Sequence, residues 1–369
     1  MSIRKYSLVM KLTAVLGGVF VGLVGAEIIA RQISPHNAAD LLFNSSDASP
    51  MNLYSIDATT RVSTTPNLDT EISSLDYQVH IRTNSVGLRG PAIDSIPTDK
   101  EQWIALGDSF TMSVQVEQED SFSGLLGKEL GVQVWNAGVD GYSTWQSKLR
   151  LEQISAQLPI RHAILTFFTG NDFQDNERFL AMQRSPLPGK PGDPIPRPAI
   201  SNWNKWWLQH SYLYAHYRIW NKQQQLGSKN DFSKGNWQDE LRIFTSTGSN
   251  RLNQLRKSTK NALQDLQAYT KKNNIELLVV IAPPAFVVDQ TRLQDTMRLV
   301  DLNPDTATVD IPQQTVLQIT KELGIRGCDL TEALRNGLKN GQNPYLYFDG
   351  HWTKEGHQIV AMRIKECLQ

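Results

Sequence analysis

The chain has 369 residues, 40% of them hydrophobic and 20% charged, so it has enough apolar material for a full globular core. Lysine plus arginine and aspartate plus glutamate both total 37, and this zero net charge argues against a nucleic-acid binder with a basic face. Two cysteines, Cys328 and Cys367, are too few for a disulfide scaffold and lack zinc-ligand spacing. They could pair in an oxidising compartment, but their apolar contexts favour two buried free thiols.

The N-terminus contains a candidate membrane segment. An uncharged run extends from Leu12 to Ala26, and the apolar sequence resumes after Glu27. Residues 1–30 are therefore a signal anchor or a signal peptide, for which Val24-Gly25-Ala26 offers a small-residue cleavage site; a buried core helix is a third interpretation. In the first two cases a basic N-terminal flank places the remaining chain on the non-cytoplasmic side, so we expect a membrane-anchored or secreted protein. The basic residues are Arg4, Lys5 and Lys11.

An N-terminal extension follows at residues 31–100. It is rich in Ser, Thr, Asn and Asp and has weak periodicity, so we expect an irregular segment that packs on the main domain. Arg89, in the stretch 83–90, could fix a neighbouring carboxylate, or the stretch could be a simple capping loop.

From residue 101 to 369 the pattern is that of one main domain in which strands alternate with helices. Apolar runs predict five strands, at 103–106, 132–135, 163–168, 277–281 and 325–330. Amphipathic stretches predict helices at about 122–130, 145–158, 255–266, 312–323 and 360–368. This alternation indicates an α/β fold whose mostly parallel sheet is covered by helices on both faces.

Residues 178–250 interrupt the alternation and form a Pro- and Trp-rich insertion. The stretch from Ser185 to Pro198 cannot be regular structure. The tryptophans that follow could form an accessory core, or a lid or aromatic substrate platform beside the active site. They are Trp203, Trp206, Trp207, Trp220 and Trp237.

Polar residues follow the ends of the predicted strands, which is where open parallel sheets bind their ligands. Gly107-Asp108-Ser109 follows the first strand, residues 136–141 follow the second, and Gly170-Asn171-Asp172 follows the third. Asp349-Gly350-His351 precedes the last helix. Together they offer a hydroxyl, a base, a carboxylate to orient the base, and donors for a developing oxyanion, which are the parts of nucleophilic acyl transfer.

The order of these four motifs resembles that of the SGNH (GDSL-like) hydrolases over residues 101–175 and 251–369. The resemblance implies a three-layer α/β/α sandwich with a five-stranded, flavodoxin-like sheet. It also implies a Ser-His-Asp triad and an oxyanion hole made of two backbone N–H groups and one side-chain amide. The residues so implied are Ser109 as nucleophile, His351 as base, Asp349 as its orienting partner, and Ser109, Gly141 and Asn171 as oxyanion donors, with Gly138 as the alternative to Gly141.

One spacing departs from that family, which usually has Asp-x-x-His where this chain has Asp349-Gly350-His351. Residues two apart place both side chains on one side only in an extended or bent segment. Gly350 allows such a bend at little conformational cost. The Asp-x-His-Trp form is also similar to a segment in alginate O-acetyltransferase relatives, where it precedes the serine block. His357 is the alternative base, although its position is more typical of a helix surface.

These observations predict an exported serine esterase that hydrolyses acetyl or other short-chain acyl esters. Two alternatives stay open: an O-acyltransferase acting on a cell-envelope polysaccharide, and a non-catalytic glycan-binding or assembly protein with a degenerate site. The sequence contains no phosphate-binding glycine loop and no metal-ligand spacing, so we expect no cofactor. The expected partners are an ester substrate, such as an acylated glycan, and the membrane through the N-terminal segment; the sequence does not set the oligomeric state.

Overall fold

The computed structural model describes most of the chain. The described residues are 2–33, 52–73, 77–97, 99–195, single positions and short runs between 203 and 217, 239–299, 302–346 and 349–369. Trp220, Trp237 and the whole segment 34–51 lie outside them.

A five-stranded parallel sheet lies at the centre of the molecule, in the order β6-β5-β7-β8-β9. The chain enters at β5 and places its second strand on one side and the other three on the other, which is the flavodoxin-like order. The predicted α/β class and parallel sheet are confirmed. The strands are β5 (Gln102–Leu106), β6 (Gln133–Asn136), β7 (Ile160–Phe168), β8 (Glu276–Ala282) and β9 (Arg326–Asp329).

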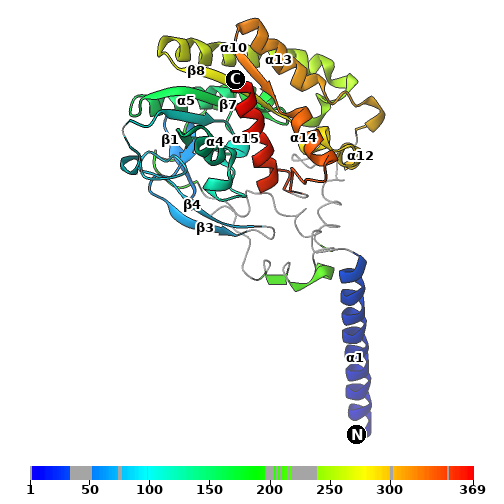
Figure 1. Ribbon diagram of the computed structural model, residues 1–369. Helices are drawn as coiled ribbons and strands as arrows, with labels where there is room; N and C mark the ends of the chain where they lie inside the picture. Colours follow the sequence, from blue (N-terminus) through cyan, green and yellow to red (C-terminus); the bar gives the residue numbers. More distant parts are fainter. Residues whose placement is uncertain are drawn as a thin grey trace.

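Helices cover both faces of this sheet, so the domain has three layers (Figure 1). Successive side chains of a strand point to opposite faces, and β5 shows this directly. Ile104 and Leu106 join one apolar core, whereas Trp103 and Ala105 join the other. The main helices are α4 (Phe122–Leu130), α5 (Thr144–Ser155), α6 (Asp172–Met182), α10 (Ser249–Lys272), α13 (Ile311–Leu323), α14 (Thr331–Lys339) and α15 (Lys354–Leu368).

The predicted helices are all present, and two main helices were not foreseen. The stripe expected at 255–266 lies within α10 and is buried. Periodicity does not indicate α6 and α14, because their starts coincide with polar loop motifs, Asn171-Asp172 and Asp329-Leu330-Thr331. Shorter helices flank the site: α3 (Ser109–Met112), α11 (Ala285–Val288) and α12 (Gln290–Leu299).

The N-terminal extension contains two antiparallel hairpins, so the expectation of an irregular segment was wrong. Its strands have only four or five residues each, too short for a clear alternation. The expected packing on the main domain is present, because Ile72 and Ile81 share an apolar core with Met112 and Val139. The strands are β1 (Tyr54–Asp57), β2 (Arg61–Thr64), β3 (Asp69–Ser73) and β4 (Gln78–Arg82).

The first helix, α1 (Ser2–Ile33), extends away from this body (Figure 1). Its stretch Met10–Gln32 has 23 residues with a mean hydropathy of 2.1 and is not buried against the rest of the chain. Twenty-three helical residues span about 35 Å, enough to cross a hydrocarbon core of about 30 Å. By length and composition α1 could therefore be a signal anchor or a signal peptide, and its exposure argues against a buried core helix.

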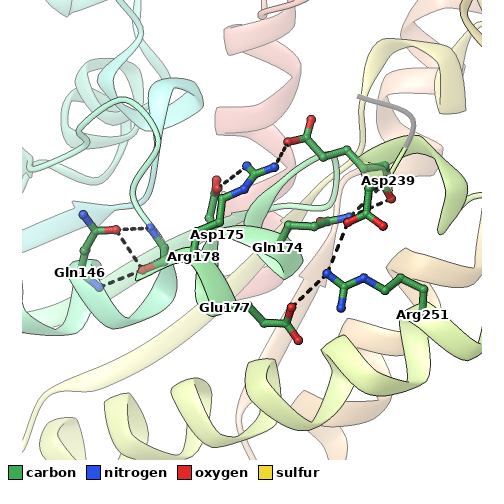
Figure 2. Close-up of polar contacts among 9 residues, drawn as sticks. Gln146, Gln174, Asp175, Glu177, Arg178, Asp239 and Arg251 are labelled. Atoms are coloured by element: carbon green, nitrogen blue, oxygen red, sulfur yellow. Dashed lines mark hydrogen bonds and ion pairs between the residues drawn. The ribbon is translucent and has the colours of Figure 1, made fainter. Parts of the chain in front are cut away.

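Ion pairs connect α6 to the start of α10 and to residues 239–240 (Figure 2). Arg178 of α6 binds Asp175 at 2.8 Å and Glu240 at 2.5 Å. Arg251 of α10 lies 3.0 Å from Glu177 and 3.3 Å from Asp239. The chain that returns at 239–240 is thereby attached to α6, the helix that begins directly after Asn171.

The two cysteines form a disulfide, so the expectation of free thiols was wrong. Cys328 lies in β9 and Cys367 in α15, with their Cα atoms 5.9 Å apart. Their apolar neighbours arise because α15 packs over this edge of the sheet, so the same contacts that bury the sulfur atoms also bring them together.

Replacing both cysteines by alanine should lower the free energy of unfolding by about 2–4 kcal/mol, because the bond closes a long loop in the unfolded chain. Urea unfolding of the full chain in mild detergent measures this change, and wild type treated with dithiothreitol should reproduce it. Complete labelling of both thiols by a maleimide in unreduced protein would contradict the bond.

Candidate active site

The serine at the end of β5 lies in a sharp strand-to-helix turn. Gly107 has φ of 144°, and a Cβ there would lie 2.5 Å from Thr111 Oγ1 and 2.7 Å from the Thr166 carbonyl oxygen. Only glycine fits this position without strain or displacement. Asp108 caps α3 by accepting the Phe110 N–H at 3.0 Å. Ser109 therefore begins the helix at the carboxyl edge of the sheet.

Asp108 is completely buried, and burial raises the pKa of its carboxyl group to about 7. Its Oδ1 atom is engaged by the Phe110 N–H, and its Oδ2 atom has no hydrogen-bond partner in the described chain. The carboxyl group thus shapes the turn before Ser109, and it makes no hydrogen bond to His351.

Arg89 holds the other end of the short helix α3. Its buried guanidinium donates to the carbonyl oxygens of Met112 at 2.7 Å, Ser113 at 2.5 Å and Val116 at 2.5 Å. The expectation that Arg89 fixes a carboxylate was therefore wrong, because the unpaired carbonyls at a helix C-terminus are equally good acceptors. Burial lowers the pKa of Arg89 to about 10, so the side chain stays charged at neutral pH.

His351 and Asp349 come from the loop that precedes α15. His351 Nε2 lies 2.7 Å from Ser109 Oγ, and His351 Nδ1 lies 2.5 Å from Asp349 Oδ1. Gly350 has φ of 77°, and this bend lets Asp349 Oδ1 also accept the backbone N–H of His351 at 3.2 Å. The two-residue spacing therefore brings both side chains to one side through a turn at glycine. The structure joins Ser109, His351 and Asp349 in one chain of hydrogen bonds.

The electrostatics of this chain favour a protonated imidazole. Burial alone would lower the pKa of His351, but the Asp349 carboxylate outweighs burial, with smaller contributions from Asp108 and Asp140, and raises it to about 9. Burial would raise the pKa of Asp349, yet its bonds to His351 and Gln115 hold it below the ordinary value. Asp349 thus stays ionised and orients the imidazole.

Aromatic rings fix the imidazole from the side. The ring centre of Phe110 lies 4.7 Å from that of His351 and 4.8 Å from that of Trp352, which is completely buried. His357 lies behind Trp352, with ring centres 5.5 Å apart. The expectation of a helix-surface histidine was wrong: His357 is buried, accepts the Phe122 N–H at 3.2 Å, and burial lowers its pKa to about 3. His357 is therefore a neutral packing residue, and no contact joins it to Ser109.

The loop after β6 offers the backbone donors. The Gly138 N–H is already bonded to Asn136 Oδ1 at 3.1 Å, and a Cβ at Gly138 would lie 2.3 Å from the Met112 nitrogen. Gly138 thus lets this loop pack against α3. Gly141 has φ of 71° and open space around its Cβ position, and its N–H donates to no described group. These facts favour Gly141 over Gly138 as the predicted oxyanion donor.

Asn171 is the residue directly before α6, at its N-cap position, beyond the end of β7. Its backbone carbonyl accepts the N–H groups of Gln174 and Asp175, while its side chain does not cap the helix. Its amide oxygen is buried and makes no hydrogen bond within the described chain. The Asn171 side chain therefore makes no structural contact of these kinds, and it is available for its predicted role as an oxyanion donor.

Three residues of the site were missed or misjudged in the sequence. Gln115 donates to Asp349 Oδ1 at 3.2 Å, Arg89 braces α3, and Phe110 packs on His351. Phe110 directly follows Ser109, so its place beside the base could have been expected. Gln115 carries no local signal, because it acts across the fold. The sequence singles out Arg89, but it does not indicate the carbonyl oxygens that Arg89 binds. Among the described residues, no group of three or more His, Cys, Asp or Glu side chains could hold a metal ion.

Comparison with known proteins relates the C-terminal part of the chain to one family. Residues 243–369, which include Asp349 and His351 but not Ser109, match the family model described as "SGNH hydrolase-like domain, acetyltransferase AlgX". This C-terminal part of the chain is similar to the SGNH hydrolase-like domain of that family. Among curated proteins, none matches this chain.

Several solved structures resemble the chain at low similarity. A member of the lipolytic protein G-D-S-L family from Veillonella parvula has 12% identity and a TM-score of 0.37, covering 72% of this chain and 97% of its own. An acetylxylan esterase from Geobacillus stearothermophilus has 14% identity and a TM-score of 0.37, with coverages of 73% and 94%. The esterase EstA from Pseudoalteromonas sp. has 11% identity and a TM-score of 0.37, with coverages of 73% and 97%.

The raised pKa of His351 predicts an alkaline pH profile for this candidate site. A histidine must be neutral to accept the serine proton, so kcat/KM for p-nitrophenyl acetate should rise with pH along a limb centred near 9. Asp349→Asn should move the limb toward lower pH and cost on the order of 10⁴-fold in kcat. Ser109→Ala measures the background hydrolysis. A wild-type limb centred at or below the ordinary histidine value would contradict the coupling to Asp349.

Proposed function

We propose that the chain is a serine enzyme that acts on acyl esters, with Ser109 as nucleophile, His351 as general base and Asp349 as the orienting carboxylate. The observation that carries the proposal is the hydrogen-bond chain from Ser109 Oγ to His351 Nε2 at 2.7 Å and from His351 Nδ1 to Asp349 at 2.5 Å. Ser109 and His351 are 242 residues apart in the sequence, yet their side chains meet. A chance contact would not place a hydroxyl, an imidazole and a carboxylate in the order that this chemistry requires.

In the proposed reaction His351 Nε2 takes the proton of Ser109 as Oγ attacks the ester carbonyl carbon. The carbonyl oxygen gains the negative charge, which the N–H groups of Ser109 and Gly141 and the Asn171 amide would stabilise. The imidazolium returns its proton to the departing alcohol, which leaves an acyl group on Ser109. Water or a second alcohol then attacks this acyl-enzyme, again with His351 as base.

Hydrolysis of acetyl or other short-chain esters is the simplest outcome. A second candidate is transfer of the acyl group to a hydroxyl of a cell-envelope polysaccharide. The match of residues 243–369 to a family model described as an acetyltransferase favours this candidate. The two reactions share the acyl-enzyme and differ only in the acceptor.

We also propose that α1 is a membrane anchor and that the catalytic domain lies outside the cytoplasm. Arg4, Lys5 and Lys11 flank the apolar stretch on its N-terminal side, a charge bias that keeps that end in the cytoplasm. The Cys328–Cys367 disulfide supports the same topology, because disulfides persist mainly in oxidising compartments.

Wild-type protein should release p-nitrophenol from p-nitrophenyl acetate, and Ser109→Ala should reduce the rate to background. An added acetyl-accepting oligosaccharide separates the two candidates, since mass spectrometry would find an acetylated sugar only if transfer occurs. Equal rates for wild type and Ser109→Ala would contradict both and favour a non-catalytic glycan-binding protein.

Asn171→Ala should lower kcat by about 100- to 1,000-fold, the usual cost of removing one oxyanion donor. KM should change little, because the lost hydrogen bond forms mainly in the transition state. Circular dichroism checks the fold. Asn176→Ala is the contrasting variant, since Asn176 bonds the Thr144 N–H and serves packing, so it should affect stability more than kcat. An unchanged kcat in Asn171→Ala would remove this residue from the site.

A further inference from the structure

Aromatic side chains form a continuous series between residues 203 and 217. We call the described residues 203, 206–207, 210–214 and 217 the aromatic segment. Trp206 and Trp207 have ring centres 5.0 Å apart, and Trp206 stacks on His210 at 4.6 Å. The series continues from Trp203 to Trp207 at 5.8 Å and from Trp207 to Tyr214 at 6.3 Å.

Several of these rings face outward. Trp203 is 69% exposed and Trp206 is 49% exposed, and neither belongs to an apolar core of the domain. The interpretation of these tryptophans as an accessory core is therefore wrong for Trp203 and Trp206. Adjacent exposed indoles on a soluble surface are unfavourable and usually mark a contact site.

The aromatic segment is attached to the domain-side end of α1. Glu27 is the only acidic residue of that helix. Its carboxylate accepts the backbone N–H groups of Tyr212 at 2.9 Å and Leu213 at 3.1 Å and the Ser211 hydroxyl at 3.0 Å. A carboxylate that receives consecutive backbone N–H groups holds a segment firmly in place.

Arg31, one turn further along α1, adds a second attachment. Its guanidinium donates to Glu27 at 3.0 Å and to the His210 carbonyl at 2.9 Å, and it lies over the ring of Tyr212 at 5.0 Å. Figure 1 shows the green pieces of this segment beside the domain-side end of α1, across the direction of the helix.

The position of Glu27 along α1 sets the depth at which the aromatic segment would lie. Between Lys11 and Glu27 the helix has no charged residue, and these 16 steps correspond to about 24 Å. With the long Lys11 side chain extended toward the interface, this length fits a hydrocarbon core, and a glutamate is costly any deeper. Glu27 therefore marks the boundary between hydrocarbon and headgroups, and the residues bonded to it lie at the same level.

We propose that the aromatic segment is a membrane-interface belt, with the indoles of Trp203 and Trp206 inserted at the headgroup level of the bilayer that holds α1. Tryptophan prefers this level because its ring is apolar while its N–H can bond to lipid carbonyls and water. The belt and α1 together would fix the catalytic domain against the membrane surface. This inference rests on the proposed anchor role of α1 and is independent of the chemistry at Ser109.

The test uses the full chain reconstituted in phosphatidylcholine vesicles whose acyl chains carry bromine either near the headgroup or deep in the bilayer. Bromine quenches nearby tryptophan fluorescence. The shallow-brominated lipid should quench wild type more strongly than the deep-brominated lipid. Most of this quenching should disappear in Trp203→Phe/Trp206→Phe, which removes the indoles while keeping aromatic rings. Glu27→Gln should weaken the quenching, because it removes the charge that holds the segment.

Trp145→Phe is the matched control. Trp145 lies in α5 of the catalytic domain, and its buried indole N–H has no partner in the described chain, so phenylalanine removes fluorescence without breaking a bond. The amount of quenched fluorescence should be unchanged in this variant. Equal quenching in wild type and Trp203→Phe/Trp206→Phe, stronger quenching by the deep lipid, or failure of the chain to associate with vesicles would each overturn the proposal. Loss of esterase activity in Ser109→Ala with unchanged quenching would separate this result from the enzymatic proposal.

Discussion

The parallel pairing of β5 between β6 and β7 is the constraint on which the site depends. Parallel strands all end at one edge of the sheet, so the turns that follow them are neighbours even though they are far apart in sequence. The three loops that carry Ser109, Gly141 and Asn171 follow β5, β6 and β7 in that order. Apolar side chains on both faces of β5 hold this strand in register, so the position of Ser109 is set by the core of the domain.

The short helix that begins at Ser109 is held at both ends by buried charged or ionisable groups. Asp108 caps its N-terminus, and Arg89 binds the carbonyls at and beyond its C-terminus. Buried groups of this kind stabilise a structure only when their geometry is fixed, because an unsatisfied partner is costly. Arg89 comes from the N-terminal extension, so the extension contributes directly to the placement of the serine. The site is therefore built from more of the chain than residues 101–369.

The other half of the site depends on a turn rather than on the sheet. Gly350 at φ of 77° lets Asp349 accept hydrogen bonds from both the backbone and the imidazole of His351. Phe110 packs against the side of the imidazole ring. A carboxylate held this close keeps the imidazole oriented and raises its pKa, which suits the proposed role of His351 as a base that takes up a proton and releases it again. The bond between the Leu346 N–H and the His351 carbonyl at 2.8 Å closes this loop on itself. The Tyr345 hydroxyl attaches the loop to the domain by donating to the Pro283 carbonyl at 2.6 Å.

The sequence by itself determined the five-stranded α/β fold and the set of polar residues at the strand ends. Apolar runs and helical stripes are local patterns, and the edge at which a parallel strand ends follows from its direction. It did not determine the hairpins of the extension, the partners of Arg89 and Gln115, the burial of His357 or the Cys328–Cys367 bond. Each of these joins segments that are distant in sequence, so no local pattern records it. The hydrogen bond between His351 and Ser109 depends on both sequence and tertiary structure. The two residues could be named from their motifs. Only the packing of the loop before α15 against α3 brings the two side chains within 2.7 Å.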